Sequence, residues 1–181
     1  MTRSGMGTRL MMTMALLAPL VACGPFERTS IPPGEEILGY GTPTDSIQLT
    51  CSAPAQVASV DTVIRPGHPA VILRAGGTTL SLDSGAFSAE RRIVLVQEPG
   101  QAFRATIDGD TARMPPPPMG KPATLRFDTS RCTPEELEQA PAWYVWRLNP
   151  AAGRSQKLAT RSNDQRIWAV IDSTSRFMIA N

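Results

Sequence analysis

The sequence contains a single histidine, and this scarcity excludes several kinds of functional site. His68 lies in segment 66–69, where prolines and a glycine predict a turn, so we expect a solvated loop residue. A serine hydrolase needs a histidine held beside its nucleophile, and a loop histidine does not provide this. The 3 cysteines include no Cys-x-x-Cys pair, so we expect neither a metal site nor a cofactor.

The acidic residues are also poorly placed for chemistry. Glu35-Glu36 and Glu135-Glu136 are adjacent in sequence, so each pair diverges and does not flank one scissile bond. Asp108-Gly109-Asp110 lacks the further ligands of a calcium loop, and we interpret it as a hairpin turn. A hydrolase with an unfamiliar site, for which Ser175 is the best serine, is the least supported hypothesis.

The sequence also has little net charge and few long apolar runs. Lys and Arg number 18 against 16 Asp and Glu, which gives a formal net charge of +2. The arginines are scattered and form no basic stripe, so the sequence predicts no nucleic-acid partner. No second apolar stretch that could cross a membrane follows residues 10–22. The length that remains after this run fits one domain.

The N-terminus combines positive charge, an apolar run and a cysteine. Arg3 and Arg9 precede residues 10–22, a run too short to span a bilayer comfortably, so residues 1–22 are predicted to be a signal peptide. The run ends in Leu20-Val21-Ala22-Cys23, which resembles the lipobox of bacterial lipoproteins. The resemblance implies cleavage before Cys23 and acylation of its thiol. An ordinary signal peptide followed by a structural Cys23 is the alternative.

Acylation of Cys23 would attach the chain to a lipid bilayer. Lipoproteins of this class carry two or three acyl chains such as palmitate, and two or more anchor a protein stably. Gly24 stands where an aspartate would resemble an inner-membrane retention signal, so the resemblance favours the outer membrane of the cell envelope. Residues 23–45 are rich in proline and glycine and lack periodicity, so we expect them to form the lipidated cysteine and a flexible tether.

Cys51 and Cys132 remain after Cys23 is assigned to lipid. A pair of cysteines in an oxidising compartment more often forms a disulfide than two free thiols, so we expect a Cys51–Cys132 bond. Two separately buried thiols are the alternative.

From residue 46 onward, short alternating or β-branched segments are separated by glycine and proline. This spacing predicts an all-β domain over residues 46–181, a Greek-key-like antiparallel sandwich or barrel. The expected strands cover residues 46–50, 57–64, 70–73, 78–82, 93–96, 103–107, 123–127, 143–148, 167–171 and 177–180.

One helix start interrupts the strands. Thr133 is a predicted N-cap, Pro134 occupies the first helical position, and Glu136 completes a capping box. We expect one short helix that connects two strands and ends before Pro141. Residues 115–118 are consecutive prolines and predict a rigid polyproline-II loop, with docking into an aromatic groove as the alternative.

Residues 76–88, followed by the strand-like segment 92–96, carry a family resemblance. Gly76-Gly77 predicts a turn before strand 78–82, and Gly85-Ala86-Phe87 follows that strand. The pattern resembles the ZU-five domain of zona-occludens proteins, netrin receptors and ankyrins, in which a glycine turn and a strand precede Pro-x-Gly-Ala-Leu. Asp83-Ser84 departs from the family's proline. The resemblance covers roughly residues 60–181 and implies a positive φ angle at Gly85 and a core position for Phe87.

The C-terminal part of the resemblance bears on self-cleavage. Some relatives in the ZU-five family cleave themselves at a His-Phe-Ser triplet, where the serine hydroxyl attacks the preceding carbonyl. The corresponding residues here are Ser173-Thr174-Ser175, so the serine is present without the histidine and phenylalanine. Self-cleavage is therefore not expected.

Trp143 and Trp168 are the candidate binding residues. Trp143 and Trp146 would point to opposite faces of one strand, and Trp168 would face outward if Ile167 faces inward. An exposed tryptophan can stack on a sugar or anchor a protein partner, whereas packing against the tether or a loop is the alternative.

These observations predict an envelope lipoprotein anchored to the lipid bilayer through the Cys23 acyl groups. Because catalytic groups are scarce and the ZU-five resemblance implies a scaffold role, we expect a non-enzymatic module that binds another envelope protein. The alternative function is binding of a cell-wall polymer or glycan through Trp168 or Trp143.

Overall fold

The structure is a computed structural model of the chain and describes residues 37–41, 46–109, 118–148, 155–163 and 165–181. The predicted signal peptide, Cys23 and the prolines at 115–117 lie outside the described residues. The described part contains no helix with the length and hydropathy that a bilayer-spanning segment requires.

The larger sheet has seven strands. All of its strand pairs are antiparallel, and several neighbours are far apart in sequence. Its spatial order is β1 (Ile37–Gly41), β11 (Ser155–Leu158), β10 (Tyr144–Leu148), β14 (Ser175–Ala180), β8 (Arg104–Gly109), β6 (Arg91–Gln97) and β3 (Ala58–Ile64).

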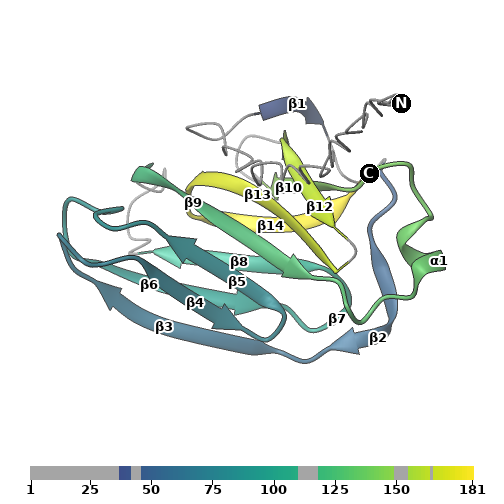
Figure 1. The fold of residues 1–181 in the computed structure, drawn as a ribbon, viewed down its shortest axis with the longest axis horizontal. Helices are drawn as coiled ribbons and strands as arrows, with labels where there is room; N and C mark the ends of the chain where they lie inside the picture. The colour runs from purple at the N-terminus through teal and green to yellow at the C-terminus, as the bar shows by residue number, and fades with distance from the viewer. Residues whose placement is uncertain (1–36, 42–45, 110–117, 149–154, 164) are drawn as a thin grey trace, which may run out of the picture. The chain divides into compact units, whose positions relative to one another are not determined.

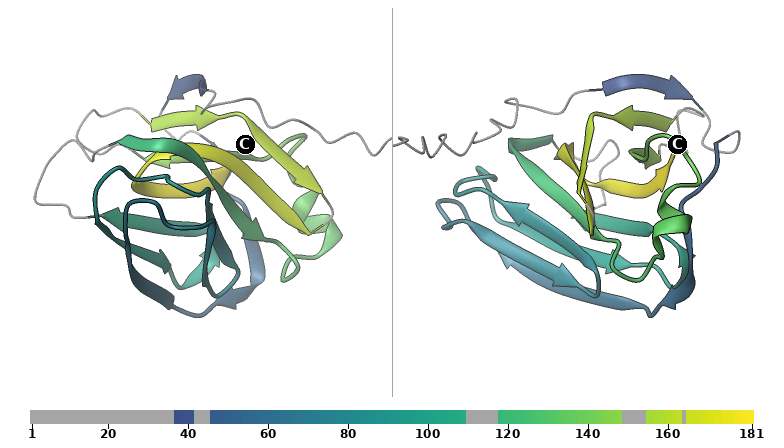
Figure 2. Two further views of the ribbon diagram at one scale, coloured as in Figure 1. Left: turned by 60° about the vertical axis from the view of Figure 1, so that its left-hand side comes forward. Right: turned by 45° about the vertical axis from the view of Figure 1, so that its right-hand side comes forward.

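The smaller sheet has five strands and is also antiparallel. Its order is β12 (Thr160–Asn163), β13 (Arg166–Ser173), β9 (Pro118–Asp128), β5 (Thr78–Leu82) and β4 (Val71–Ala75). A two-stranded ribbon pairs β2 (Thr50–Ala55) with β7 (Gly100–Ala102). The chain passes repeatedly between the two large sheets, so that β4, β5 and β9 lie in one layer and β3, β6 and β8 in the other (Figures 1 and 2).

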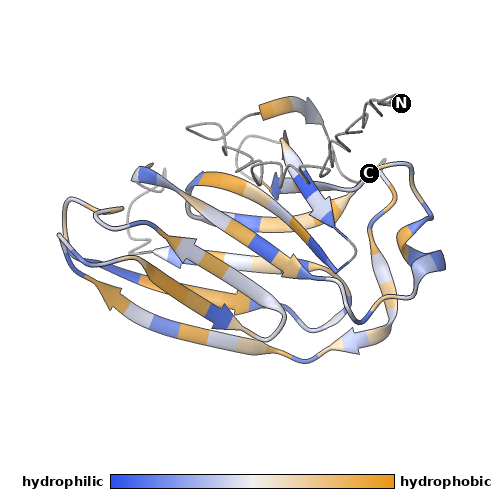
Figure 3. Ribbon diagram, in the orientation of Figure 1, coloured by the Kyte–Doolittle hydropathy of each residue, from blue (hydrophilic) through white to orange (hydrophobic). Residues whose placement is uncertain are grey.

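The core lies between the two layers because apolar and polar residues alternate along most strands (Figure 3). Every second residue of β5 is buried, and β13 and β6 show the same period. Both sheets contribute to one apolar cluster, whose fully buried members include Leu80, Leu95, Leu125, Ile171 and Phe177. The prediction of an all-β antiparallel sandwich with one short connecting helix is confirmed.

The strand predictions differ from the structure mainly at the N-terminal end of the domain. The predicted strand over 46–50 is wrong in its bounds, because β2 begins at Thr50 and Gln48 forms only an isolated bridge with Ala180. The backbones of Ile47 and Leu49 nevertheless bond to the chain's last residues, Asn181 and Ile179. Within the predicted tether, residues 37–41 form β1 and pair with β11.

The turns around the ZU-five-like segment form as expected. Gly76 has a φ angle of 56° in the two-residue connection between β4 and β5. Gly85 has a φ angle of 69°, and Phe87 is 7% exposed within the core cluster. Both glycines therefore occupy the left-handed region that side chains disfavour.

The predicted helix is present as α1, Pro134–Leu137, between β9 and β10. The Thr133 hydroxyl accepts a hydrogen bond from the Glu136 backbone, and the Glu136 carboxylate accepts one from the Thr133 backbone. The capping box is confirmed.

Two loop interpretations are wrong. Asp108 and Gly109 are the last residues of β8, and β8 and the following strand β9 belong to different sheets, so no hairpin joins them. His68 is not solvated but only 9% exposed. Its Nε2 atom accepts a hydrogen bond from the Ala86 backbone at 3.2 Å, while Nδ1 lies against the Pro69 carbonyl. His68 therefore braces the Gly85 turn.

Candidate functional site

Cys51 and Cys132 form the predicted disulfide. Their Cα atoms are 4.9 Å apart although 81 positions separate them in the sequence. The bond joins β2 to the segment that leads into α1. Glu136 lies near the two sulfur atoms, but sulfurs bonded to each other are not thiolates and cannot bind a metal in that form.

Polar contacts around the disulfide are mutually satisfied. The Glu136 carboxylate accepts hydrogen bonds from the Ser52 backbone at 2.7 Å, from the Ser52 hydroxyl and from the Thr133 backbone at 2.9 Å. Because these bonds favour the ionised form, the Ser52 bonds foremost, they lower the pKa of Glu136. Nearby, Arg131 donates to backbone carbonyls of the β2–β7 ribbon, and partial burial lowers its pKa. The contacts of Glu136 and Arg131 therefore hold the helix segment and the β2–β7 ribbon together.

Trp143 takes a structural position. Its indole Nε1 donates a hydrogen bond to the Leu137 carbonyl at 2.6 Å, and its half-buried ring packs against the core cluster. Trp146 packs separately with Met178 and Ala180, in agreement with the predicted opposite faces. Trp143 thus holds α1 against the sandwich.

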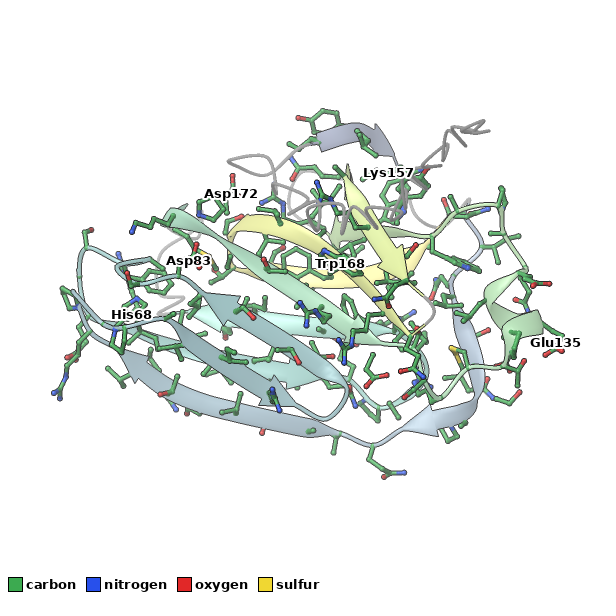
Figure 4. The ribbon with its side chains drawn as sticks, in the orientation of Figure 1. His68, Asp83, Glu135, Lys157, Trp168 and Asp172 are labelled. Carbon is green, nitrogen blue, oxygen red and sulfur yellow. A yellow bond between two sulfur atoms is a disulfide. The ribbon has the colours of Figure 1, made fainter. Side chains whose placement is uncertain are left out.

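Trp168 lies on the outer face of the five-stranded sheet, by which we mean the side away from the core. Ile167 and Ala169 on either side of it are each 2% exposed, whereas Trp168 is half-buried. Figure 4 shows the indole lying over the sheet beside β9. The Arg126 guanidinium carbon is 5.9 Å from the centre of the indole ring, within cation–π range. The predicted outward orientation of Trp168 is confirmed.

Strand register places Trp168 in a row of side chains that crosses the whole outer face. Trp168 is opposite Arg126 on β9 and Arg161 on β12, and Arg126 is in turn opposite Thr79 on β5. Thr79 is opposite Arg74 on β4, which completes what we call the arginine row. Directly opposite residues of antiparallel strands share a face, so the row is continuous from one edge of the sheet to the other.

A depression of about 250 Å³ lies beside the row. Its lining includes Arg74 and Arg126 of the row, Arg166, Asp128 and the Gly76–Gly77 turn. The Nε atom of Arg126 is buried and has no hydrogen-bond acceptor among the described residues. A buried donor without an acceptor costs free energy.

Positive charge dominates this face. Among the described residues, Arg74 and Arg166 form no ion pair. Asp128 also lines the depression and accepts one hydrogen bond, from the Ser130 backbone at 2.9 Å. The arrangement offers guanidinium donors and an aromatic ring to an anionic ligand.

Sequence reasoning found Trp168 but missed the arginines around it. Alternation along each strand marks Arg74 and Arg126 as outward-facing. However, strands β4, β5, β9, β13 and β12 are neighbours only through long-range pairing, which the local pattern does not encode. A chain with scattered arginines can therefore gather them on one face without any basic run in its sequence.

Comparison of the chain with family models, curated proteins and solved structures finds no match. The ZU-five and lipobox resemblances therefore stay predictions. A ligand for the arginine row can be inferred only from the residues of the row itself.

Proposed function

We propose that the chain is a non-enzymatic binding module, anchored by lipid in a bacterial cell envelope, whose outer sheet face engages a ligand of that envelope. The observation that carries the proposal is the arginine row, in which Trp168 lies between Arg161 and Arg126. The row places three arginines and a tryptophan on the outer face of the sheet. These side chains point away from the core and do not contribute to its packing.

Two further features support an envelope setting. The Leu20-Val21-Ala22-Cys23 sequence predicts acylation at Cys23, as described above. The Cys51–Cys132 disulfide fits an oxidising compartment, because cytosolic thiols are generally kept reduced. A tether between the lipid and the domain would let the sheet face reach material next to the membrane.

The binding test uses the full chain, produced in a bacterium that processes lipoproteins and purified in mild detergent. Cosedimentation with purified bacterial cell walls, which offer no bilayer to the acyl chains, measures the bound fraction. We expect binding by the wild-type chain and a loss of binding in Trp168→Ala. Tyr40→Ala is the matched control, because Tyr40 is an exposed aromatic on β1 in the other sheet, 64% accessible. Equal binding by wild type and Trp168→Ala would reject the outer face as the binding surface.

A second candidate function is supported by the edge strand β1. β1 ends the seven-stranded order, and Ile37, Leu38 and Tyr40 on it are 37%, 51% and 64% exposed. An edge strand with exposed apolar side chains is a template for a strand of a protein partner. Under this hypothesis Tyr40→Ala would weaken crosslinking of the chain to an envelope protein in intact cells, and Trp168→Ala would not.

A further inference from the structure

We infer that the ligand of the outer face is an anionic glycan, a chain of sugars that carry carboxylate groups. This inference rests on the proposed function and names the ligand class for the same surface. It depends on three features of the face, namely the guanidinium groups, the indole ring and the hydrogen-bonding groups of the depression.

The guanidinium groups fit carboxylates that recur along a polymer. Arg74 and Arg126 lie on strands separated by β5, and Arg126 and Arg161 lie on strands separated by β13. With neighbouring strands about 5 Å apart, the backbones of successive arginines in the row are roughly 10 Å apart. A planar guanidinium donates two parallel hydrogen bonds to one carboxylate, so Arg74 and Arg126 can each hold one group.

Arg126 is the arginine best prepared to bind an anion. The half-buried side chain is held next to the Trp168 ring, and its Nε donor is buried without an acceptor. Because this side chain is already held beside the ring, less side-chain entropy remains to be lost when the guanidinium binds a carboxylate. The exposed Arg74 would add affinity at the other end of the depression.

Trp168 and the polar lining favour a sugar as the carrier of the carboxylate. An indole face accommodates the apolar side of a sugar ring. The depression also presents the hydroxyls of Thr79 and Ser81 and the Asp128 carboxylate, which accepts hydrogen bonds only. Asp128 accepts one hydrogen bond from the Ser130 backbone, and its remaining lone pairs can accept from sugar hydroxyl groups.

The same features argue against nucleic acid. Nucleic acid is recognised through its phosphates and through stacking of its bases. Single-stranded nucleic acid is usually bound by several aromatic platforms in a strongly positive groove. Trp168 is the one aromatic residue of the row, and the formal net charge of the chain is only +2.

The test measures binding of the full chain in detergent to three immobilised polymers by biolayer interferometry. Polygalacturonate is the carboxylated glycan, dextran is the neutral glycan, and a single-stranded oligodeoxynucleotide is the competing anion. We expect binding to polygalacturonate alone, weakening as sodium chloride is raised because salt screens exposed charges.

Variants then assign the binding to the row. Arg126→Gln should weaken binding to polygalacturonate about ten- to a hundredfold, the range expected for a charge-assisted hydrogen bond. Arg74→Gln tests the row at an exposed position where misfolding is not a concern. Arg65→Gln is the matched control, because it removes the same charge from an exposed side chain outside this face. Melting curves of each variant verify that it is folded.

The outcomes separate the inference from the proposed function. Selective binding to polygalacturonate that falls in Arg126→Gln and Arg74→Gln, but not in Arg65→Gln, supports the inference. Equal binding to dextran, tighter binding to the oligonucleotide, or no binding to polygalacturonate overturns it. If the chain fails to bind polygalacturonate yet cosediments with cell walls through Trp168, the ligand class is wrong and the proposed function stands. If Trp168→Ala changes neither assay, both fail.

Discussion

Removal of the Cys51–Cys132 bond has an effect that can be calculated from the structure. The perturbation is the double substitution Cys51→Ala and Cys132→Ala, which opens a loop spanning 81 positions. Cross-linking restricts the unfolded chain, and the chain-entropy relation gives about 15 cal/mol/K for such a loop, or about 4.5 kcal/mol at 25 °C. Domains of this size are stable by only about 5–15 kcal/mol, so a large part of the free energy of unfolding would be lost.

Urea unfolding of the full chain, followed by tryptophan fluorescence, measures this loss. Trp143 is a suitable probe because its indole is bonded to Leu137 in the helix beside the disulfide. We expect the double variant to unfold at much lower urea than the oxidised wild type. Reductant should lower the urea midpoint of the wild type to that of the double variant and leave the midpoint of the variant unchanged. A difference below about 1 kcal/mol would refute the reasoning, since it would mean that the bond hardly restricts the unfolded chain.

Further substitutions test the turns and the capped helix. His68→Phe keeps a ring beside Phe87 but removes the acceptor of the Ala86 N–H, so we expect a loss of about 1–2 kcal/mol in the free energy of unfolding, measured in urea. Gly76→Ala should cost at least about 1–2 kcal/mol by the same measurement, because φ is 56° and the new Cβ would lie 2.5 Å from the Gln97 amide; an unchanged midpoint would contradict the turn geometry. Glu136→Gln should be less stable than wild type at pH 7. Its folded-state pKa is lowered, so the advantage of the wild type is present above the ordinary glutamate pKa of about 4.3 and disappears as pH falls through the lowered value. Melting temperatures of the wild type and the variant at pH 7 and pH 3 test this. If the difference between the two proteins is the same at both pH values, the ionised Glu136 carboxylate is not the source of the stability.

Local patterns were sufficient for the strands whose apolar residues alternate. Strand β5 was predicted with its observed bounds, because Leu80 and Leu82 alternate with polar residues after a glycine turn. Strands β11 and β12 were missed, since Ser155–Leu158 and Thr160–Asn163 contain few apolar residues and are held by their neighbours. β1 was assigned to the tether because the prolines and glycines around it predict a chain without regular structure.

The candidate site was predictable only in part. Alternation within β13 placed Trp168 on the outside, and the same reasoning could have placed Arg126 there. The pairing of Arg126 with Trp168 and of Thr79 with Arg74 depends on which strands are neighbours, and that is decided by packing of the whole core. The hydrogen bond of Trp143 to the Leu137 carbonyl could not be predicted either, because no periodicity reveals it.

The envelope location is the claim on which the ligand, the tether and the role of the module all depend. Mass spectrometry of the intact chain, isolated from a bacterium that processes lipoproteins, tests it most directly. The account predicts a mature chain that begins at Cys23 and carries the added mass of a diacylglyceryl group. A chain that retains Met1, or one that begins at Cys23 with an unmodified thiol, would contradict it.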